Sequence, residues 1–230
     1  QQYKKYQWIE VMAEKHRGRD VRKESYRPDS DTIQIIGEPI KSNPGNWVER
    51  ARYALVKKAR SMEDLNDQRE ADRTSLGVFK PKKIHDLVIS DDDPDWKAGF
   101  KAALQQARLW ETRTVSKEPP RKVPFKFHYQ FECDDARCNG HRMMIEDWEV
   151  GALFWRLVDQ GLSHKDAADK VREKFLSELC GPDKDTHFFV GTILAYPKTW
   201  VVIGVFYPKI QPEKPKAATG PTLFDMEANP

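Results

Sequence analysis

The sequence predicts an α+β fold, built from an antiparallel sheet or a partly open OB-like barrel, with pairs of helices and a zinc-knuckle hairpin. Strand-like segments come in neighbouring pairs, and helix-like segments come in pairs as well. The segment "FKFHYQFE" (125–132) alternates aromatic and polar side chains with a period of two, as a half-buried strand does. The next nine residues, "CDDARCNGH" (133–141), hold two of the three cysteines and one of the six histidines.

The composition is that of a folded protein without a membrane span. The chain has 230 residues, of which 33% are charged and 11% aromatic. It has no apolar run of about 18 residues and no signal peptide. Three cysteines at uneven spacing do not make a disulfide framework, so we expect a cytoplasmic protein. Because the chain opens with Gln1 and runs directly into a strand-like segment, we expect it to be part of something longer.

The first predicted part, residues 1–115, is an α+β region with a basic loop. Its strand-like segments "YQWIEV" and "TIQIIGEPI" around that loop resemble part of an OB-type barrel, which implies an OB-like fold for this part. Two β-rich segments flank that loop, and capping boxes open two helices: Asn46 with Glu49, and Ser61 with Asp64. The elements expected in order are a strand at 6–13, a strand at 32–40, helices at 46–60 and 62–72, strands "SLGVFK" and "KIHDLVIS", and a helix opened by Asp93 and Pro94.

A proline-rich connector, "SKEPPRKVP" (116–124), predicts the boundary to a second α+β part at 125–208. After the alternating strand we expect helices at about 147–160 and 163–179. The segments "THFFVGTIL" and "WVVIGVFYP" then predict an antiparallel hairpin, apolar on both faces and therefore in the middle of a sheet. Residues 209–230 are rich in proline and lysine and predict a flexible tail.

The spacing C-x4-C-x2-H predicts a structural zinc site with Cys133, Cys138 and His141 as ligands. Zinc prefers thiolate sulfur and imidazole nitrogen, and Asn139-Gly140 supplies a turn that can present the histidine. A closed site needs a fourth ligand, for which Cys180 is the first candidate and His187 the second. A hairpin tip without metal is an equal alternative, because the spacing is not a complete finger signature. A catalytic metal with an open position is the third interpretation.

Weaker candidates for catalysis are His141, Asp147, Asp185 and His187. They belong to two clusters, "IEDWE" and "DKDTH", in which acids neighbour a histidine and could bind a metal or act as a base. The simpler interpretation is helix capping for the first cluster and a polar turn for the second. The sequence contains no P-loop, G-x-G-x-x-G or G-x-S-x-G motif, which argues against ATP hydrolysis and α/β-hydrolase chemistry.

A basic loop near the N-terminus is the main candidate for contact with nucleic acid. Residues 1–60 carry 14 Lys and Arg against 8 Asp and Glu, a net charge of +6, whereas the remainder carries 25 against 28, a net of −3. Basic loops contact phosphate without reading sequence, although a solvated surface explains the same charge. The predicted contact residues are Arg17, Arg19, Arg22, Lys23, Arg27 and, on the alternating strand, Lys126.

Several segments together resemble a family of uncharacterised prokaryotic proteins associated with mobile and defence gene neighbourhoods. These segments are "KYQWIEV", "ESYRP", "SLGVFKPKKIHDLVI", "FECDDARCNGHRMMIEDWE" and "DTHFFVGT…WVVIGVFYP". The resemblance spans most of residues 3–208 and implies a nucleic-acid-associated role, as a subunit beside a helicase or nuclease. It supplies no catalytic residues.

Three hypotheses about function follow. The first is a nucleic-acid-binding module within a prokaryotic defence or DNA-processing complex, which implies a protein partner. The second is a metal-dependent nuclease or related hydrolase. The third is a scaffold subunit that contacts other proteins through the helix pair and through Leu223 and Phe224 in the tail.

Overall fold

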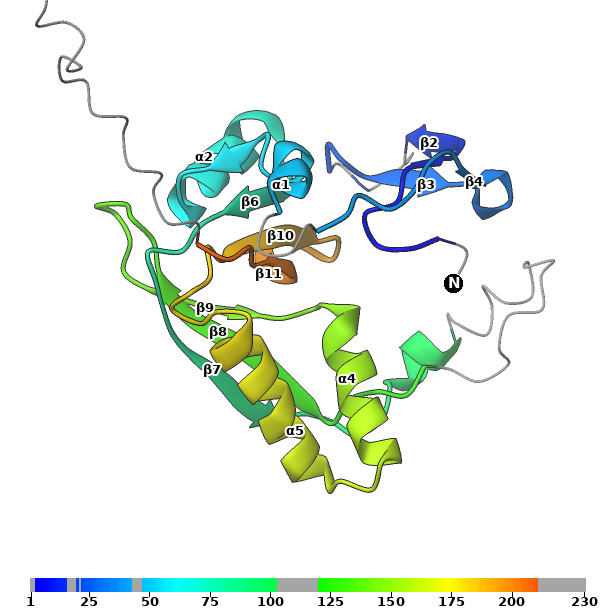
Figure 1. Cartoon of the computed structure of the whole chain (residues 1–230), viewed down its shortest axis with the longest axis vertical. Coiled ribbons are helices and arrows are strands. Elements are labelled where there is room, and N and C mark those ends of the chain that lie inside the picture. Colours follow the sequence, from blue (N-terminus) through cyan, green and yellow to red (C-terminus); the bar gives the residue numbers. More distant parts are fainter. Residues whose placement is uncertain (1–2, 16–19, 21, 43–46, 103–119, 211–230) are drawn as a thin grey trace, which may run out of the picture.

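The computed structural model confirms the α+β class, with strands in several small antiparallel sheets and helices packed on them (Figure 1). It describes residues 3–15, 20, 22–42, 47–102 and 120–210. The predicted tail at 211–230 and part of the predicted basic loop, including Arg17 and Arg19, lie outside the described residues. Among the described residues, no helix combines the length and the apolar composition that a transmembrane span requires.

The N-terminal region forms two small sheets instead of two long strands. Strand β1 (Ile9–Glu10) pairs with β4 (Gln34–Ile35), and β2 (Ala13–Lys15) pairs with β3 (Tyr26–Pro28), both antiparallel. The single strand predicted at 6–13 is therefore divided between β1 and the start of β2. The described residues contain no closed barrel, so an OB-like N-terminal part stays a prediction.

A four-stranded sheet in the order β11-β10-β6-β5 forms the centre of the molecule. Its strands are β5 (Lys58–Ala59), β6 (Leu76–Phe79), β10 (His187–Ile193) and β11 (Tyr196–Phe206). The predicted C-terminal hairpin is thus confirmed, and β10 is the interior strand of the two. Strand β11 ends the order, but Val202 forms a parallel bridge to Ile145, which links this sheet to the next one.

The second large sheet has three strands, β7 (Lys83–Asp91), β8 (Phe125–Glu132) and β9 (His141–Met144), in that order. The alternation on β8 is as predicted, because Phe127, Tyr129 and Phe131 are buried. Strands β7 and β8 pair antiparallel over most of their length, although they lie on either side of the predicted connector. The predicted parts 1–115 and 125–208 therefore share both large sheets.

Side-chain caps define the first residues of helices α2, α4 and α5. Helix α2 (Met62–Asp72) begins after Ser61, whose Oγ accepts a hydrogen bond from the Asp64 backbone N–H at 3.0 Å. Asp147 caps α4 (Trp148–Asp159), and Ser163 caps α5 (His164–Arg172), which continues as a π-helical turn at Glu173–Glu178. Figure 1 shows α4 and α5 side by side below the four-stranded sheet.

Two helices differ from the prediction. Helix α1 (Val48–Ala54) ends early, because Lys58 and Ala59 leave the helical path and pair with β6, which buries Ala59. The predicted cap of α1, Asn46, lies outside the described residues. The helix expected after Pro94 is seen at residues 98–102, and its continuation also lies outside them.

Candidate metal centre

Four side chains of ligand type converge where the hairpin tip (residues 133–141) meets the start of α2. They are Glu63, Cys133, Cys138 and His141, and one ligand atom from each lies within 4.8 Å of the others. No other such group of three or more His, Cys, Asp or Glu side chains occurs in the part of the chain that the structure describes. Three of the four are the residues that the sequence predicts.

The local structure explains why these side chains meet. Cys133 directly follows β8, and His141 begins β9, where it pairs with Phe131 and stacks on its ring at 5.0 Å between centroids. Gly140 has a φ of +85°, a left-handed conformation that a side chain would strain, and it turns the chain back toward β9. Glu63 lies in the first turn of α2, which faces the hairpin tip.

Backbone N–H groups already point at both sulfurs. The N–H of Cys133 and that of Gly140 donate to Cys138 Sγ, with N···S distances of 3.1 and 3.4 Å. The N–H of Met62, in the first turn of α2, donates to Cys133 Sγ at 3.5 Å. Such donors, together with the positive end of a helix dipole, favour a thiolate over a thiol.

The oxygen and nitrogen ligands have unsatisfied polar atoms. His141 Nε2 lies 3.0 Å from Glu63 Oε1, so the two atoms are within ion-pair distance. Nevertheless His141 Nε2 forms no hydrogen bond, and Glu63 Oε2 is likewise buried without a partner. Buried polar atoms without partners are costly, and a cation at the point where they converge would satisfy both.

Burial controls the protonation of the innermost ligand. Cys133 is 4% exposed, and burial raises the pKa of its thiol to about 12, despite the hydrogen bond from Met62. A bound divalent cation reverses this effect, because a coordinating thiol is deprotonated.

Polar contacts outside the four ligands also hold the hairpin tip on α2. Ser61 Oγ donates to Asp135 Oδ2 at 2.9 Å, and Arg137 pairs with Asp135 and with Asp67 at 3.2 and 3.0 Å. Hydrogen bonds from Arg137, and then from Ser61, hold the pKa of Asp135 well below its usual range. The ligands are therefore positioned by contacts that do not require a metal.

Cys180 is not part of this group, and Glu63 occupies the place predicted for it. The Cys180 thiol donates to the carbonyl of Phe175 at 3.2 Å and lies 3.7 Å from the Tyr129 hydroxyl, beneath the π-helical turn. Burial raises its pKa to about 11. His187, the second candidate, is 1% exposed, and its Nδ1 contacts the carbonyl of Asp185 at 3.0 Å.

The four predicted catalytic residues do not form a common ligand group in the described chain. His141 belongs to the metal centre. Asp147 is 8% exposed and caps α4 by accepting from the Glu149 N–H at 2.9 Å, and burial raises its pKa. Asp185 pairs with Lys80 at 2.6 Å.

The basic residues predicted to contact nucleic acid are partly engaged within the protein. Arg22 pairs with the buried Asp20 at 2.7 Å, Lys23 pairs with Asp72, and Lys126 pairs with Asp92 at 2.8 Å. Arg27 lies in β3, all of whose residues are exposed.

Two family matches divide the chain after residue 56. Residues 1–56 match the family described as Domain of unknown function (DUF8758), and residues 57–226 match Domain of unknown function (DUF8757). The connector predicted as a boundary, at 116–124, lies inside the second match, as do all four ligands of the candidate metal centre. No curated protein and no solved structure matches the chain. Because residues 57–226 are well over half of the 230, the chain belongs to the family Domain of unknown function (DUF8757).

Proposed function

We propose that this protein is a binding module whose hairpin tip is linked to α2 by one structural zinc ion. The ion is held by Glu63, Cys133, Cys138 and His141. The observation that carries the proposal is the convergence of four ligand atoms within 4.8 Å, with Glu63 Oε2 and His141 Nε2 buried and lacking hydrogen bonds.

The donor set favours zinc over harder cations. Mg²⁺ and Ca²⁺ select oxygen ligands, whereas two sulfurs and one imidazole suit a softer ion. Zinc bond lengths of about 2.0–2.3 Å place tetrahedral ligand atoms roughly 3.3–3.8 Å apart. Since no pair of the four atoms is more than 4.8 Å apart, the widest pairs need to approach by at most about 1–1.5 Å, which rotation of the side chains can supply.

A structural role follows from the number and origin of the ligands. Four protein donors fill a tetrahedron and leave no position for water or substrate, as in closed structural sites. They also come from two segments, α2 and the hairpin tip, that are 70 positions apart between Glu63 and Cys133. One ion would therefore fix a long-range contact of the fold.

The purified protein is expected to contain about one zinc per chain by elemental analysis. The variant Cys138→Ser should lose most of it, because a serine hydroxyl is a poor substitute for thiolate. Cys180→Ser is the matched control and should keep the full amount, since Cys180 lies outside the group. Equal zinc loss in both variants, or no zinc in the unaltered protein, would contradict the proposal.

The Glu63→Gln variant distinguishes a structural ion from a catalytic one. If Glu63 is the fourth ligand, zinc binding should weaken by at least 10-fold, measured by competition with a chelating dye. Unchanged affinity would mean that Cys133, Cys138 and His141 hold the ion alone, with an open position. The structural role would then be wrong.

The second proposed function is contact with nucleic acid, as a subunit of a prokaryotic defence or DNA-processing complex. The net charge of +6 over residues 1–60 and the exposed position of Arg27 favour it. Because Arg22, Lys23 and Lys126 have carboxylate partners, Arg27 is the candidate among the described residues. Arg17 and Arg19 join it from the sequence alone, since they lie outside the described residues.

Binding of labelled single- and double-stranded oligonucleotides should be measurable by fluorescence polarisation at low salt. The affinity should fall steeply between about 50 and 200 mM salt, as counterion release requires. The triple variant R17A/R19A/R27A should weaken it at least 10-fold, whereas the charge-matched control R156A/K165A/K170A, on α4 and α5, should not. No binding at low salt would refute this function.

A further inference from the structure

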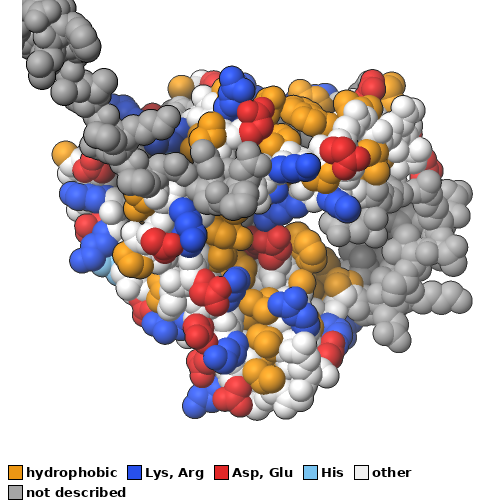
Figure 2. Space-filling view, in the orientation of Figure 1, with side chains coloured by type: hydrophobic (Ala, Val, Ile, Leu, Met, Phe, Trp, Pro, Cys, Tyr) orange, Lys and Arg blue, Asp and Glu red, His pale blue; other side chains and the backbone are white. Residues whose placement is uncertain are grey.

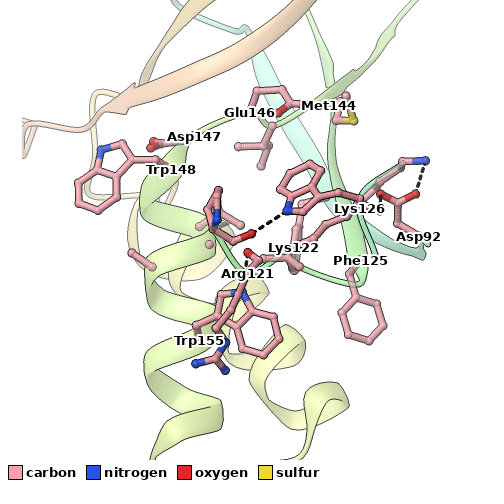
Figure 3. A pocket seen from close by; sticks show the side chains of 18 residues that line it. Asp92, Arg121, Lys122, Phe125, Lys126, Met144, Glu146, Asp147, Trp148 and Trp155 are labelled. Carbon is pink, nitrogen blue, oxygen red and sulfur yellow. Dashed lines mark hydrogen bonds and ion pairs between the residues drawn. The ribbon is translucent and has the colours of Figure 1, made fainter. Parts of the chain in front are cut away.

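A cavity of about 670 Å³ lies between α4, the ends of β8 and β9, and the segment that enters β8 (Figure 3). None of the four proposed zinc ligands lines it, so it is independent of the metal centre. Its size is that of pockets that enclose small organic ligands. Its lining combines three tryptophans with apolar side chains and a few charged groups.

Backbone carbonyls fix two of the tryptophans. Trp96 Nε1 donates to the carbonyl of Pro120 at 2.6 Å, and Trp155 Nε1 donates to that of Arg121 at 3.1 Å. The Arg121 guanidinium stacks on the Trp155 ring at 3.7 Å. The third, Trp148, is 70% exposed in the first turn of α4. The indole N–H groups of Trp96 and Trp155 are thus used internally. Arg121 covers one face of Trp155, and Trp96 packs on Phe100 with ring centroids 4.6 Å apart, so each of these two rings offers a ligand at most its other face, whereas the Trp148 ring is exposed.

The charges around the cavity balance in number. Three cations line it, Arg121, Lys122 and Lys126, against three carboxylates, Asp92, Glu146 and Asp147. Because Arg121 pairs with Asp159, which is not among the lining residues, this equal count does not tell which charges are free, and the individual pairs decide that.

The cations are also neutralised individually. Lys122 and Lys126 both pair with Asp92 at 2.8 Å, and Figure 3 shows Lys126 beside that carboxylate. Burial alone would raise the pKa of Asp92, but hydrogen bonds from the two lysines outweigh it and lower the pKa to about 2. Arg121 pairs with Asp159 at 2.8 Å. No cation of the lining is therefore left to clamp a phosphate.

These pairs leave two carboxylates of the lining over, Glu146 and Asp147. Asp147 is buried and accepts the Glu149 N–H, so Glu146 is the one whose acceptor atoms are unused. Its carboxylate has no hydrogen-bond or ion-pair partner within the described ranges, and burial, followed by the charge of Asp92, raises its pKa. Its backbone N–H donates to the carbonyl of Val202 at 2.8 Å, which fixes the residue between β9 and α4. A carboxylate offers two acceptor atoms in one plane.

We propose that this cavity binds a nucleobase, and specifically guanine. A neutral, planar heteroaromatic ring can stack on the indole faces that remain open, and it needs no cation from the lining. Guanine presents two neighbouring donors, N1–H and the N2 amino group, which can pair with both oxygens of Glu146. Stacking on an aromatic side chain and a bidentate contact are the two interactions by which proteins hold unstacked bases.

This inference would give the proposed nucleic-acid contact a base-binding subsite. It is tested with a free nucleoside, so that its failure is separate from the failure of backbone binding. A protein that does not bind oligonucleotides could still bind guanosine, and a protein that does not bind guanosine could still bind the nucleic-acid backbone.

Titration of the protein with guanosine, monitored by calorimetry and by tryptophan fluorescence, should show saturable binding with one site per chain. Inosine keeps N1–H but lacks the N2 amino group, and adenosine lacks both donors. Each should bind at least about 10-fold more weakly, because the first loses one hydrogen bond of the bidentate contact and the second loses both. Glu146→Gln should weaken guanosine binding by a similar factor. The matched control Glu70→Gln, on the exposed face of α2, should leave it unchanged.

The zinc content and the thermal midpoint of Glu146→Gln show whether this variant is folded. A second variant, Trp148→Ala, removes an exposed indole from the lining of the cavity and should reduce stacking on the base. No saturable guanosine binding would overturn the inference. Equal affinity for guanosine, inosine and adenosine would overturn the choice of guanine. Binding of tetramethylammonium in place of guanosine would assign the cavity to a cationic ligand and overturn it as well.

Discussion

Removing the proposed zinc ion with a chelator is expected to lower the thermal midpoint of this protein by roughly 8–16 °C. A ligand that binds only the folded state stabilises it by about 4 kcal/mol when its free concentration is about 1,000 times the dissociation constant. In a chain of this size each kcal/mol shifts the midpoint by about 2–4 °C. Adding zinc back should restore the original value.

The expected effect is large because removal of the ion leaves four ligand side chains close together without a cation between them. Without an ion, two sulfurs, a carboxylate and an imidazole lie within 4.8 Å of one another, and two of their polar atoms are buried without a hydrogen bond. The contacts of Ser61, Asp135 and Arg137 keep the hairpin tip near α2, but they do not satisfy those atoms. The apo protein should therefore remain folded at low temperature and melt earlier.

Two cysteine variants make the measurement specific, with differential scanning fluorimetry as the readout. Cys138→Ser should melt at the temperature of the chelated protein and should no longer respond to chelator. Cys180→Ser should respond like the unaltered protein, because Cys180 contacts Phe175 and Tyr129 instead of the hairpin tip. If the unaltered protein melts at one temperature with and without chelator, zinc has no structural role.

Most of the fold could be predicted because its signals are local. The alternation of 125–132, and Ser61, Asp147 and Ser163 at helix starts, each require only a few neighbouring residues. The N-terminal strands were harder, because β1 to β4 have two or three residues each and are interrupted by turns. The sequence alone could not place the end of α1, since Lys58 and Ala59 pair with Val78 and Phe79, residues 20 positions later in the chain.

The metal centre shows the same limit at the level of single ligands. Cys133, Cys138 and His141 fall within one hairpin, so their spacing is visible in the sequence. Glu63 lies 70 positions before Cys133, and an acid in the first turn of a helix already has an explanation as a partner of the helix dipole. Only the packing of α2 against the hairpin tip brings it to the other three candidate ligands. Cys180 looked suitable because it was the one cysteine left over, which says nothing about position.

The second large effect is expected for Phe188→Ala, which should destabilise the protein by about 3–5 kcal/mol, the usual cost of removing a buried aromatic ring. Phe188 is fully buried on β10 and stacks on Tyr129 of β8, with ring centroids 4.5 Å apart. It also meets Phe131 and Phe79 edge-on, at 5.5 and 6.0 Å. One ring thus contacts strands of both large sheets.

The neighbour Phe189 supplies the control. Adjacent residues of a strand point to opposite faces, and Phe189 is only half-buried, so Phe189→Ala should cost clearly less in the free energy of unfolding from urea denaturation. Phe188→Leu, which keeps most of the apolar volume, should fall between the two and provides a folded variant if alanine unfolds the chain. Equal costs for the two alanine variants would mean that the sheets are not joined through Phe188. In that case the contact between β11 and Ile145, together with the metal centre, would have to hold them together.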